Sequence, residues 1–420
     1  MARAFSFFMD QSRELIPNLF RTEYRKIVSV LVKSFGFERI EIAEDIASDT
    51  FLTAAETWGL KGLPANPTAW LYQVAKNKAK NYWQRSSHFE KKIAPELSAL
   101  PNAAQPEIDL SLQNINDSQL QMMFALCNPV IPQEAQIGLS LRILCGFGID
   151  EIADAFLSNK EAINKRLFRA KEKLREEDIK MEMPHATEIA QRLDAVLSTL
   201  YLLFSEGYYS ASANTTLRKD LCWEAIHLTR FLLENKITDQ PETNALLSLM
   251  YFHASRFDAR LTEQGEIILY DDQDPNLWNV ESIQKGEYYL NESARGNKLS
   301  KYHLEAAIAY WHTQAGESTE KWENILQLYN QLLQIEYSPM AALNRTYALA
   351  KARSTGEAIV EAEKLKLSDN HFYFSLLGEL YKKVDRQKSI DNFNRALKLS
   401  KTPPEKRLLQ TKIDQVSKES

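Results

Sequence analysis

Apolar positions in the first 90 residues repeat at the three-to-four-residue spacing of a helix. From Leu15 to Leu31 they follow one helical face, and Gly36 then provides a stop. The same spacing predicts a second helix over 42–58 and a third over 68–85, separated by a loop rich in glycine and proline. Together these segments form one predicted helical domain, residues 1–92.

The pattern changes after residue 92 and then returns. Residues 93–118 contain three prolines, and all of their charged side chains are acidic, which predicts a flexible linker. Helical spacing resumes over 119–180, and residues 186–420 read as a long helical array after a joint at 179–185. Only 13 of the 420 residues are glycine. Because sheet turns need glycine, the whole chain is predicted to be all-α.

The net charge of −5 alone argues against nucleic-acid binding, but the distribution of charge reverses that expectation. Residues 76–92 hold six Lys or Arg and one Glu, and residues 160–175 hold seven Lys or Arg and two Glu. Between Glu38 and Glu56, six acidic residues are opposed by Arg39 alone. Two basic patches and one acidic patch predict separate surfaces for DNA and for a protein partner.

The sequence gives no sign of export or of membrane insertion. No run approaches the roughly 18 consecutive apolar residues of a membrane helix. The short apolar segment at the N-terminus is followed at once by acidic residues, unlike a secretory signal. Cys127, Cys145 and Cys222 form no CxxC pair and are expected to be buried thiols in a reducing compartment. We therefore expect a cytoplasmic protein.

The most specific local pattern in the chain is that of a helix-turn-helix whose second helix is basic. Ala153 provides the small residue at which two helices cross, and Ile163, ten positions later, provides the apolar residue that closes the angle. Ser158 and Glu161 match a capping box that would begin the second helix. Leu157 occupies the turn position that often holds glycine. An ordinary helical hairpin with a solvated basic face is the alternative.

A second basic segment, residues 66–85, interleaves aromatic and basic side chains. Basic side chains track phosphates, and aromatic rings can stack on unpaired bases. Some of these aromatic residues, Trp70 among them, are expected to belong to the core. The preceding helix, from Ala43 to Leu52, has an acidic face, which by itself would be interpreted as a solvated surface.

In combination, these segments resemble the sigma factors of the extracytoplasmic-function type. Residues 44–52 resemble the acidic pattern of the family's region 2, and residues 67–77 resemble the P-x-A-W-L-x-x-V-A-x-N stretch that follows it. The helix-turn-helix, followed by Arg-Ala-Lys at 169–171, resembles region 4. The resemblance covers residues 10–178.

The resemblance implies two partners, core RNA polymerase and promoter DNA. Docking on polymerase is assigned to Glu44, Asp45, Asp49 and Leu52. Opening and holding of the minus-ten promoter strand is assigned to Trp70, Tyr72, Lys76, Asn77, Lys80, Asn81, Trp83 and Arg85. Reading of the upstream minus-thirty-five element is assigned to Lys160, Glu161, Asn164, Lys165, Arg166 and Arg169.

Residues 186–420 resemble the helical extension of one subgroup of these factors. Leu377, Gly378 and Tyr381 match the L-G-x-x-Y helix of a tetratricopeptide repeat, and residues 344–365 read as a further helical pair. Several polar residues here are costly to bury unless they are paired, so they predict an internal network or a pocket for a protein or small-ligand partner. These residues are Glu206, His253, Arg256, Gln273 and Asp274. The sequence departs from the subgroup's pattern at Ala254 and at Pro275-Asn276.

No familiar catalytic, metal or nucleotide-binding motif occurs, so we expect neither an enzyme nor a bound metal or cofactor. Two other functions stay open. A helix-turn-helix regulator that acts without polymerase, with a tetratricopeptide-like sensing domain, leaves residues 44–52 and 66–85 unexplained. A repeat scaffold with no DNA role leaves the basic helix that begins near Lys160 without a use.

Overall fold

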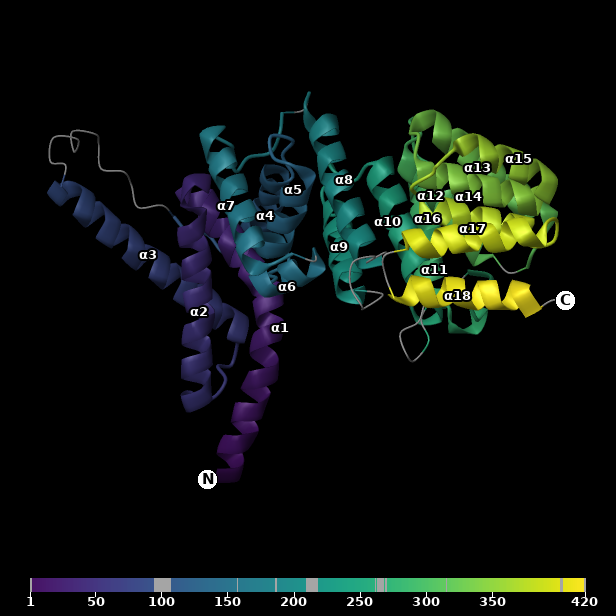
Figure 1. Cartoon of the computed structure of the whole chain (residues 1–420). Coiled ribbons are helices and arrows are strands. Elements are labelled where there is room, and N and C mark those ends of the chain that lie inside the picture. Colours follow the sequence, from purple (N-terminus) through teal and green to yellow (C-terminus); the bar gives the residue numbers. More distant parts are fainter. Residues whose placement is uncertain are drawn as a thin grey trace. The chain divides into compact units, whose positions relative to one another are not determined.

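The computed structural model describes residues 2–93, 107–156, 158–185, 187–208, 218–260, 262, 268, 270–314, 316–400 and 403–418. Every regular element within these residues is a helix, which confirms the all-α prediction (Figure 1). The chain divides into two compact units, residues 1–199 and residues 200–420. None of the described helices is long and apolar enough to cross a membrane.

The first unit is built from short and long helices that pack around α1. Its elements are α1 (Ala2–Phe35), η1 (Phe37–Arg39), α2 (Ile40–Lys61), α3 (Pro67–Ile93), α4 (Leu112–Leu126), α5 (Gln133–Leu139), η2 (Ser140–Leu144), α6 (Ile149–Ala155), α7 (Lys160–Glu176) and the first half of α8 (Ile189–Tyr208). The middle of α1 packs against both α2 and α4, and α2 also packs on α3. Tyr24, Ile27, Leu31 and Trp58 are almost completely buried in this core.

Two glycines set the ends of the first helices. At Gly36, φ is 90° and the N–H donates to Val32 O at 2.9 Å, so the predicted stop of α1 is confirmed. The expected loop from Gly59 is wrong, because α2 continues to Lys61 and ends where Gly62 takes a φ of 82°. Both angles lie in the left-handed region that glycine adopts without strain.

The predicted linker, residues 93–118, is described only in part, because residues 94–106 lie outside the described residues. Ser111 caps α4 by accepting from Asn114 N, and α4 then begins at Leu112, six residues before the predicted end of the linker. The sequence has no strong apolar pattern in this first turn, which explains why the pattern alone placed the helix later.

The two helices of the predicted helix-turn-helix correspond to α6 and α7, which pack on each other. Ala153 and Ile163, at the predicted crossing, are 5 % and 1 % exposed. The predicted capping box is wrong by one residue: Asn159, not Ser158, is the N-cap, and its side chain accepts from Ala162 N at 2.8 Å. Asparagine and serine are comparably good N-caps, so the sequence has two adjacent positions at which the helix could begin. Leu157, in the turn, lies outside the described residues.

The second unit is an array of helices that pack on their sequence neighbours. Its elements are the second half of α8, α9 (Lys219–Leu232), α10 (Pro241–Ala254), η3 (Phe257–Ala259), η4 (Tyr270–Asp272), η5 (Pro275–Leu277), α11 (Val280–Ser293), α12 (Lys301–Thr313), α13 (Thr319–Ile335), α14 (Pro339–Ala352), α15 (Thr355–Leu365), α16 (His371–Tyr381), α17 (Arg386–Leu399) and α18 (Pro403–Lys418). Consecutive helices from α12 to α18 are in contact, and the pair predicted over 344–365 is present as α14 and α15.

The pair α16–α17 shows why the L-G-x-x-Y pattern has its glycine. The ring of Phe393 on α17 lies so close to Gly378 on α16 that an added Cβ would stand 2.6 Å from it. Ser389 Oγ also donates to Gly378 O at 2.7 Å. The missing side chain therefore lets two helix backbones approach closely.

Candidate functional site

The four residues predicted to dock on polymerase lie on α2, and the structure places them on two faces. Asp45, Asp49 and Leu52 are exposed, with 57 % of Leu52 open to solvent. Glu44 lies on the other face and is only 7 % exposed. Neighbouring residues on a helix are turned by about 100°, so Glu44 and Asp45 cannot serve one flat surface.

Glu44 is bound by two cations, one from α7 and one from η2. Lys171 Nζ on α7 donates to Glu44 Oε2, and Arg142 Nε lies 3.3 Å from Glu44 Oε1. One helical turn earlier on α2, Glu41 pairs with Arg175 of α7, and its Oε1 lies 4.0 Å from Lys171 Nζ. Sequence analysis missed these partners because Lys171 and Glu44 are 127 positions apart and no local pattern links them.

Helix α1 makes two further contacts, one with η2 and one with α4. Arg25 Nη1 donates to Leu144 O at 3.4 Å, and Lys33 Nζ donates to Asn114 Oδ1 at 2.9 Å. The acidic side of α2 and the back of α7 therefore belong to the same compact unit, residues 1–199.

Two of the predicted strand-opening residues on α3 are partly structural. The ring of Trp70 meets Trp58 edge-on, with ring centroids 5.3 Å apart. Tyr72 donates its hydroxyl hydrogen to Glu23 Oε2 at 2.5 Å. Burial and the Glu23 carboxylate raise the pKa of Tyr72 above its usual range, so this hydroxyl stays protonated. Both side chains thus tie α3 to the core.

The remaining strand-opening residues form an exposed polar face along α3. Asn77, Lys80, Asn81 and Arg85 are exposed, and Lys76 is half-buried. Trp83 is also half-buried; its ring stacks on Phe35 at 6.1 Å, and the guanidinium of Arg39 lies 5.3 Å from its centroid. Lys78, which the sequence analysis did not select, lies 3.6 Å from Asp49 on α2. The face combines donors with the partly accessible ring of Trp83.

Helix α7 has one buried and one exposed side. Ile163, Leu167, Ala170, Lys171 and Leu174 form the buried side. The exposed side carries Lys160, Glu161, Asn164, Lys165 and Arg169, together with Phe168, which is 59 % exposed and was not selected from the sequence.

Two of the predicted DNA-reading cations on α7 already have partners. Lys160 pairs with Asp150 at 3.0 Å. Arg166 is half-buried: it pairs with Glu134 at 3.2 Å, and its guanidinium lies 5.6 Å from the Phe156 ring centroid. Arg166 is therefore held against the body of the motif, whereas Asn164 and Lys165 lie on its open face.

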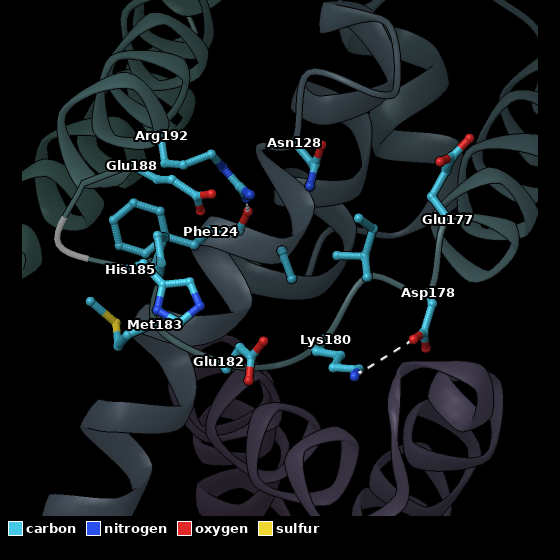
Figure 2. Close-up of a pocket in the computed structure, with 13 residues that line it drawn as sticks. Phe124, Asn128, Glu177, Asp178, Lys180, Glu182, Met183, His185, Glu188 and Arg192 are labelled. Carbon is cyan, nitrogen blue, oxygen red and sulfur yellow. Dashed lines mark hydrogen bonds and ion pairs between the residues drawn. The ribbon is translucent and has the colours of Figure 1, made fainter.

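A hollow of about 320 Å³ lies at the joint that follows α7, between α4, the 177–185 segment and the start of α8 (Figure 2). Arg192 donates to Phe124 O at its wall, and burial lowers the pKa of Arg192. Lys180 and Asp178 pair at 3.7 Å on the opposite rim. No residue predicted from the sequence as functional lines this hollow.

In the second unit, two predicted residues meet in a cationic and aromatic cluster. Arg256 is 8 % exposed; its Nη2 donates to Tyr208 Oη at 3.4 Å, and its guanidinium lies 5.4 Å from the Tyr270 centroid. Lys321, 3 % exposed, donates to Tyr270 Oη at 3.1 Å. His253 lies against Tyr208, with ring centroids 4.6 Å apart. Burial, and then Arg256, hold the pKa of His253 well below its usual value.

Several polar atoms of this cluster have no hydrogen-bond partner in the structure. Within the described part of the second unit they include Arg256 Nε, His253 Nδ1, His312 Nδ1, Gln273 Oε1 and Trp278 Nε1. The carboxylates of the described residues form no ion pair with Arg256. Unsatisfied buried polar groups call for a partner such as water, an ion or a ligand.

The other predicted residues of this region lie apart from Arg256 or have local roles. Gln273 Nε2 donates to Ile268 O at 3.2 Å. Asp274 is exposed and caps η5 by accepting from Asn276 N at 2.9 Å. Glu206 is half-buried near the end of α8. The structure therefore brings together His253 and Arg256, which both contact Tyr208.

Comparisons with known proteins identify two segments and one relative. Residues 19–89 match the model of sigma-70 region 2, and residues 192–294 match a family of unknown function (DUF6596). An uncharacterized protein of Rhizobium meliloti (strain 1021) is 33 % identical over 391 residues, which cover 91 % of this chain and 92 % of the relative. No solved structure matches the chain.

Proposed function

We propose that this chain, which belongs to one family with the Rhizobium meliloti protein and carries a segment similar to sigma-70 region 2, is a sigma-70 family factor of the extracytoplasmic-function type. In this role it binds core RNA polymerase in the cytoplasm, recognises and opens promoter DNA and directs transcription initiation. The observation that carries the proposal is the region 2 match over α1, α2 and α3, the helices that hold the acidic and basic faces.

Strand opening is proposed for the exposed face of α3. Lys80 and Arg85 are exposed and can neutralise phosphates of a single strand, and the partly open ring of Trp83 can stack on an unpaired base. Opening a duplex costs unstacking energy, so the factor must offer compensating contacts to one strand. Because Trp70 and Tyr72 are engaged in the core, we propose that they position α3.

Upstream recognition is proposed for the open side of α7. Asn164 and Lys165 project from the first turns of the helix, as the second helix of a helix-turn-helix requires for major-groove contact. Lysine can bind guanine and asparagine can bind adenine at their base edges. The exposed ring of Phe168, one turn further on, can contact a thymine methyl group.

The second unit is proposed to be a regulatory domain with tetratricopeptide-like helix pairs and no enzymatic activity. The cluster around Arg256 supports a small ligand, because a buried guanidinium that forms no ion pair within the described residues favours an anionic group. We expect inorganic phosphate, used as the probe, to raise the unfolding temperature of the full chain. Arg256→Gln should remove that rise and the exposed-site control Lys219→Gln should keep it; no rise in the unaltered chain would reject the ligand.

Polymerase binding is tested first by co-purification of the full chain with core RNA polymerase. Asp49→Lys should lower the recovered polymerase by on the order of tenfold, because it places like charges against a basic docking surface. Asp117→Lys, an exposed site on α4 with the same change of charge, is the control. Full recovery with Asp49→Lys would remove α2 from the interface.

The alternative, a regulator that acts without polymerase, gives a different result in the same experiment. Such a protein would not recover polymerase but would still protect a promoter fragment from nuclease. Permanganate reactivity then separates the steps: with polymerase present, Lys80→Ala should lower the reactivity of the minus-ten strand more than it lowers polymerase recovery.

A further inference from the structure

We infer that helices α12, α13 and α14 of the second unit form a docking site for a protein segment in which an acidic residue directly follows an aromatic one. In the structure this site is filled by the chain's own Tyr270 and Asp271, which belong to η4. A partner protein that offers the same two side chains in the same order would take their place. This inference rests on the proposed function of the second unit as a regulatory domain.

The carboxylate of Asp271 is held by two donors on α14. Its Oδ2 accepts from Tyr347 Oη at 2.8 Å and from Lys351 Nζ at 3.1 Å. The two donors are four residues apart, so they lie on one face of the helix. Asp271 comes from a turn 76 and 80 positions away in the chain. The face of α14 thus binds a carboxylate that no neighbouring segment supplies.

Tyr270 occupies a second part of the site, between the end of α12 and the start of α13. Its hydroxyl donates to His312 O at 2.9 Å and accepts from Lys321 Nζ at 3.1 Å. Its ring meets the ring of His312 edge-on, with centroids 4.7 Å apart. The aromatic and the acidic side chain are therefore received separately, and their order along the chain decides which goes where.

Side chains carry the attachment of η4 to these helices. The N–H of Gln273 donates to Tyr270 O at 3.2 Å, which closes the turn on itself. Within the described part of the chain, the backbone hydrogen bonds of residues 270–272 do not reach α12, α13 or α14. Another chain can therefore replace the two side chains without breaking a helix.

The charges around Lys351 favour a single carboxylate over a polyanion such as nucleic acid. Glu317 Oε2 already lies 3.8 Å from the Lys351 ammonium group, so little positive charge is left for further anions. Burial, and then the hydrogen bond to Asp271, raise the pKa of Tyr347 above its usual range. Its hydroxyl therefore stays a donor, which matches a carboxylate acceptor. These features indicate a peptide as the occupant.

The site is open enough for its internal occupant to be exchanged. The side chain of Asp271 is 47 % exposed and that of Lys351 is 33 % exposed. Ion pairs with this exposure contribute little to stability, so the bound state of η4 is only weakly favoured by the contact itself. Its advantage over a partner is the covalent link, because a tethered ligand acts at a high effective concentration.

The test uses the full chain and a separate copy of the internal occupant. The probe is the acetylated peptide Tyr-Asp-Asp-Gln-Asp, a copy of residues 270–274, labelled at its C-terminal end and followed by fluorescence anisotropy. Asp271→Asn keeps the size of an exposed side chain but removes its charge, which weakens the tethered occupant without endangering the fold. The peptide should bind this variant on the order of tenfold more tightly than the natural chain.

The chain offers a matched control in the next residue. Asp272 is also exposed but takes no part in the contacts with α14, so Asp272→Asn should bind the peptide as weakly as the natural chain does. The peptide itself can be changed in the same way. Asparagine in place of its first aspartate should abolish the binding, whereas asparagine in place of its second should leave it intact.

A second pair of variants locates the peptide on α14. In the Asp271→Asn chain, Lys351→Gln should remove the gain in affinity. Lys364→Gln should keep it, because Lys364 is an exposed lysine of α15 that pairs with Glu361 one turn away. Equal affinity of the peptide for the natural chain and Asp271→Asn would overturn the docking site. Binding that survives Lys351→Gln would overturn it as well.

Neither polymerase nor promoter DNA enters this measurement, so the two proposals fail separately. If the peptide does not bind Asp271→Asn, the docking site is overturned, and the co-purification still decides the proposed function. If the chain recovers no polymerase, the proposed function fails, and the anisotropy measurement still decides whether α14 binds an acidic segment.

Discussion

Lys165 and Arg166 are neighbours on α7 with different surroundings. Lys165 is exposed on the open side, while Arg166 is held between Glu134 and the ring of Phe156. We expect Lys165→Ala to weaken upstream-element binding by about 1–3 kcal/mol, the value of a lost base contact. Arg166→Ala should cost less, because its guanidinium must first leave its partners. Footprinting of both variants checks the order, and equal losses would mean that Arg166 turns toward DNA.

His312 makes the stability of the second unit depend on pH. Burial lowers the pKa of His312 to about 3, and the neighbouring charges of Arg256 and Lys321 act in the same direction. In the unfolded chain the pKa of the imidazole is about 6.5. Below that pH the unfolded state therefore binds a proton that the folded state does not bind. Stability is therefore full above about pH 6.5 and falls as pH drops toward 3.

The size of this effect is limited by one proton. For one titrating group, the free energy of unfolding cannot change by more than about 1.4 kcal/mol per pH unit. In urea unfolding, the natural chain should have a lower free energy of unfolding at pH 5.5 than at pH 7.5. His312→Gln should make this difference smaller by about 1 kcal/mol. The same sign holds for His253, so part of the dependence will persist. An unchanged dependence in His312→Gln would contradict the burial of a neutral imidazole.

Among the helix pairs, α16–α17 gives a direct test of backbone approach. Gly378→Ala places a methyl group 2.6 Å from ring atoms of Phe393, so we expect it to destabilise the second unit by about 1–3 kcal/mol in urea unfolding. The control is Gly356→Ala at the start of α15, where an added Cβ meets no atom within 4 Å. That variant should be neutral or stabilising by up to about 1 kcal/mol. Equal effects would show that helix propensity, not packing, sets the response.

The sequence predicted elements whose signals are local. The stop at Gly36, the buried residues Ala153 and Ile163 and the helix that carries Gly378 each depend on a few neighbouring positions, and the structure contains all of them. Helix ends were less accurate, since Gly59 lies inside α2. A glycine is compatible with a helix interior at a modest cost, so it does not fix an end by itself.

Side-chain partners across the chain could not be read from the pattern. Glu44 looked like its exposed neighbours Asp45 and Asp49, because its charge indicates solvent and its burial depends on Lys171, far away in the sequence. Likewise, the basic character of α7 does not reveal that Arg166 pairs with Glu134. Composition predicts which surfaces are charged, but only the packed structure shows which charges cancel.

For the molecule as a whole, a fragment that lacks the second unit is informative only if it keeps the complete first unit. The first half of α8 belongs to the first unit: Arg192 donates to Phe124 O, and Thr199 Oγ1 donates to Gln136 Oε1 at 2.8 Å. A fragment ending at residue 180 loses these contacts and the buried Leu193, and should unfold at lower denaturant than a fragment ending at residue 200.

The longer fragment, 1–200, is therefore the one to compare with the full chain in transcription. We expect it to lose activity, because the second unit is proposed to regulate the factor and holds more than half of the chain. In vitro transcription from the cognate promoter, with both proteins checked for helix content by circular dichroism, measures the effect. Activity equal to that of the full chain would make the second unit dispensable for initiation.

Helix α8 also limits how such a factor can be recombined. The boundary between the two units falls within a continuous helix, between Thr199 and Leu200, and not in a loop. A gene fusion that exchanged the C-terminal half at that boundary would have to preserve the phase of the helix, because one inserted residue rotates everything after it by about 100°. Chimeric chains should therefore tolerate a junction before residue 189 only where the first unit still provides the partners of Arg192 and Thr199, so that both halves of α8 stay together.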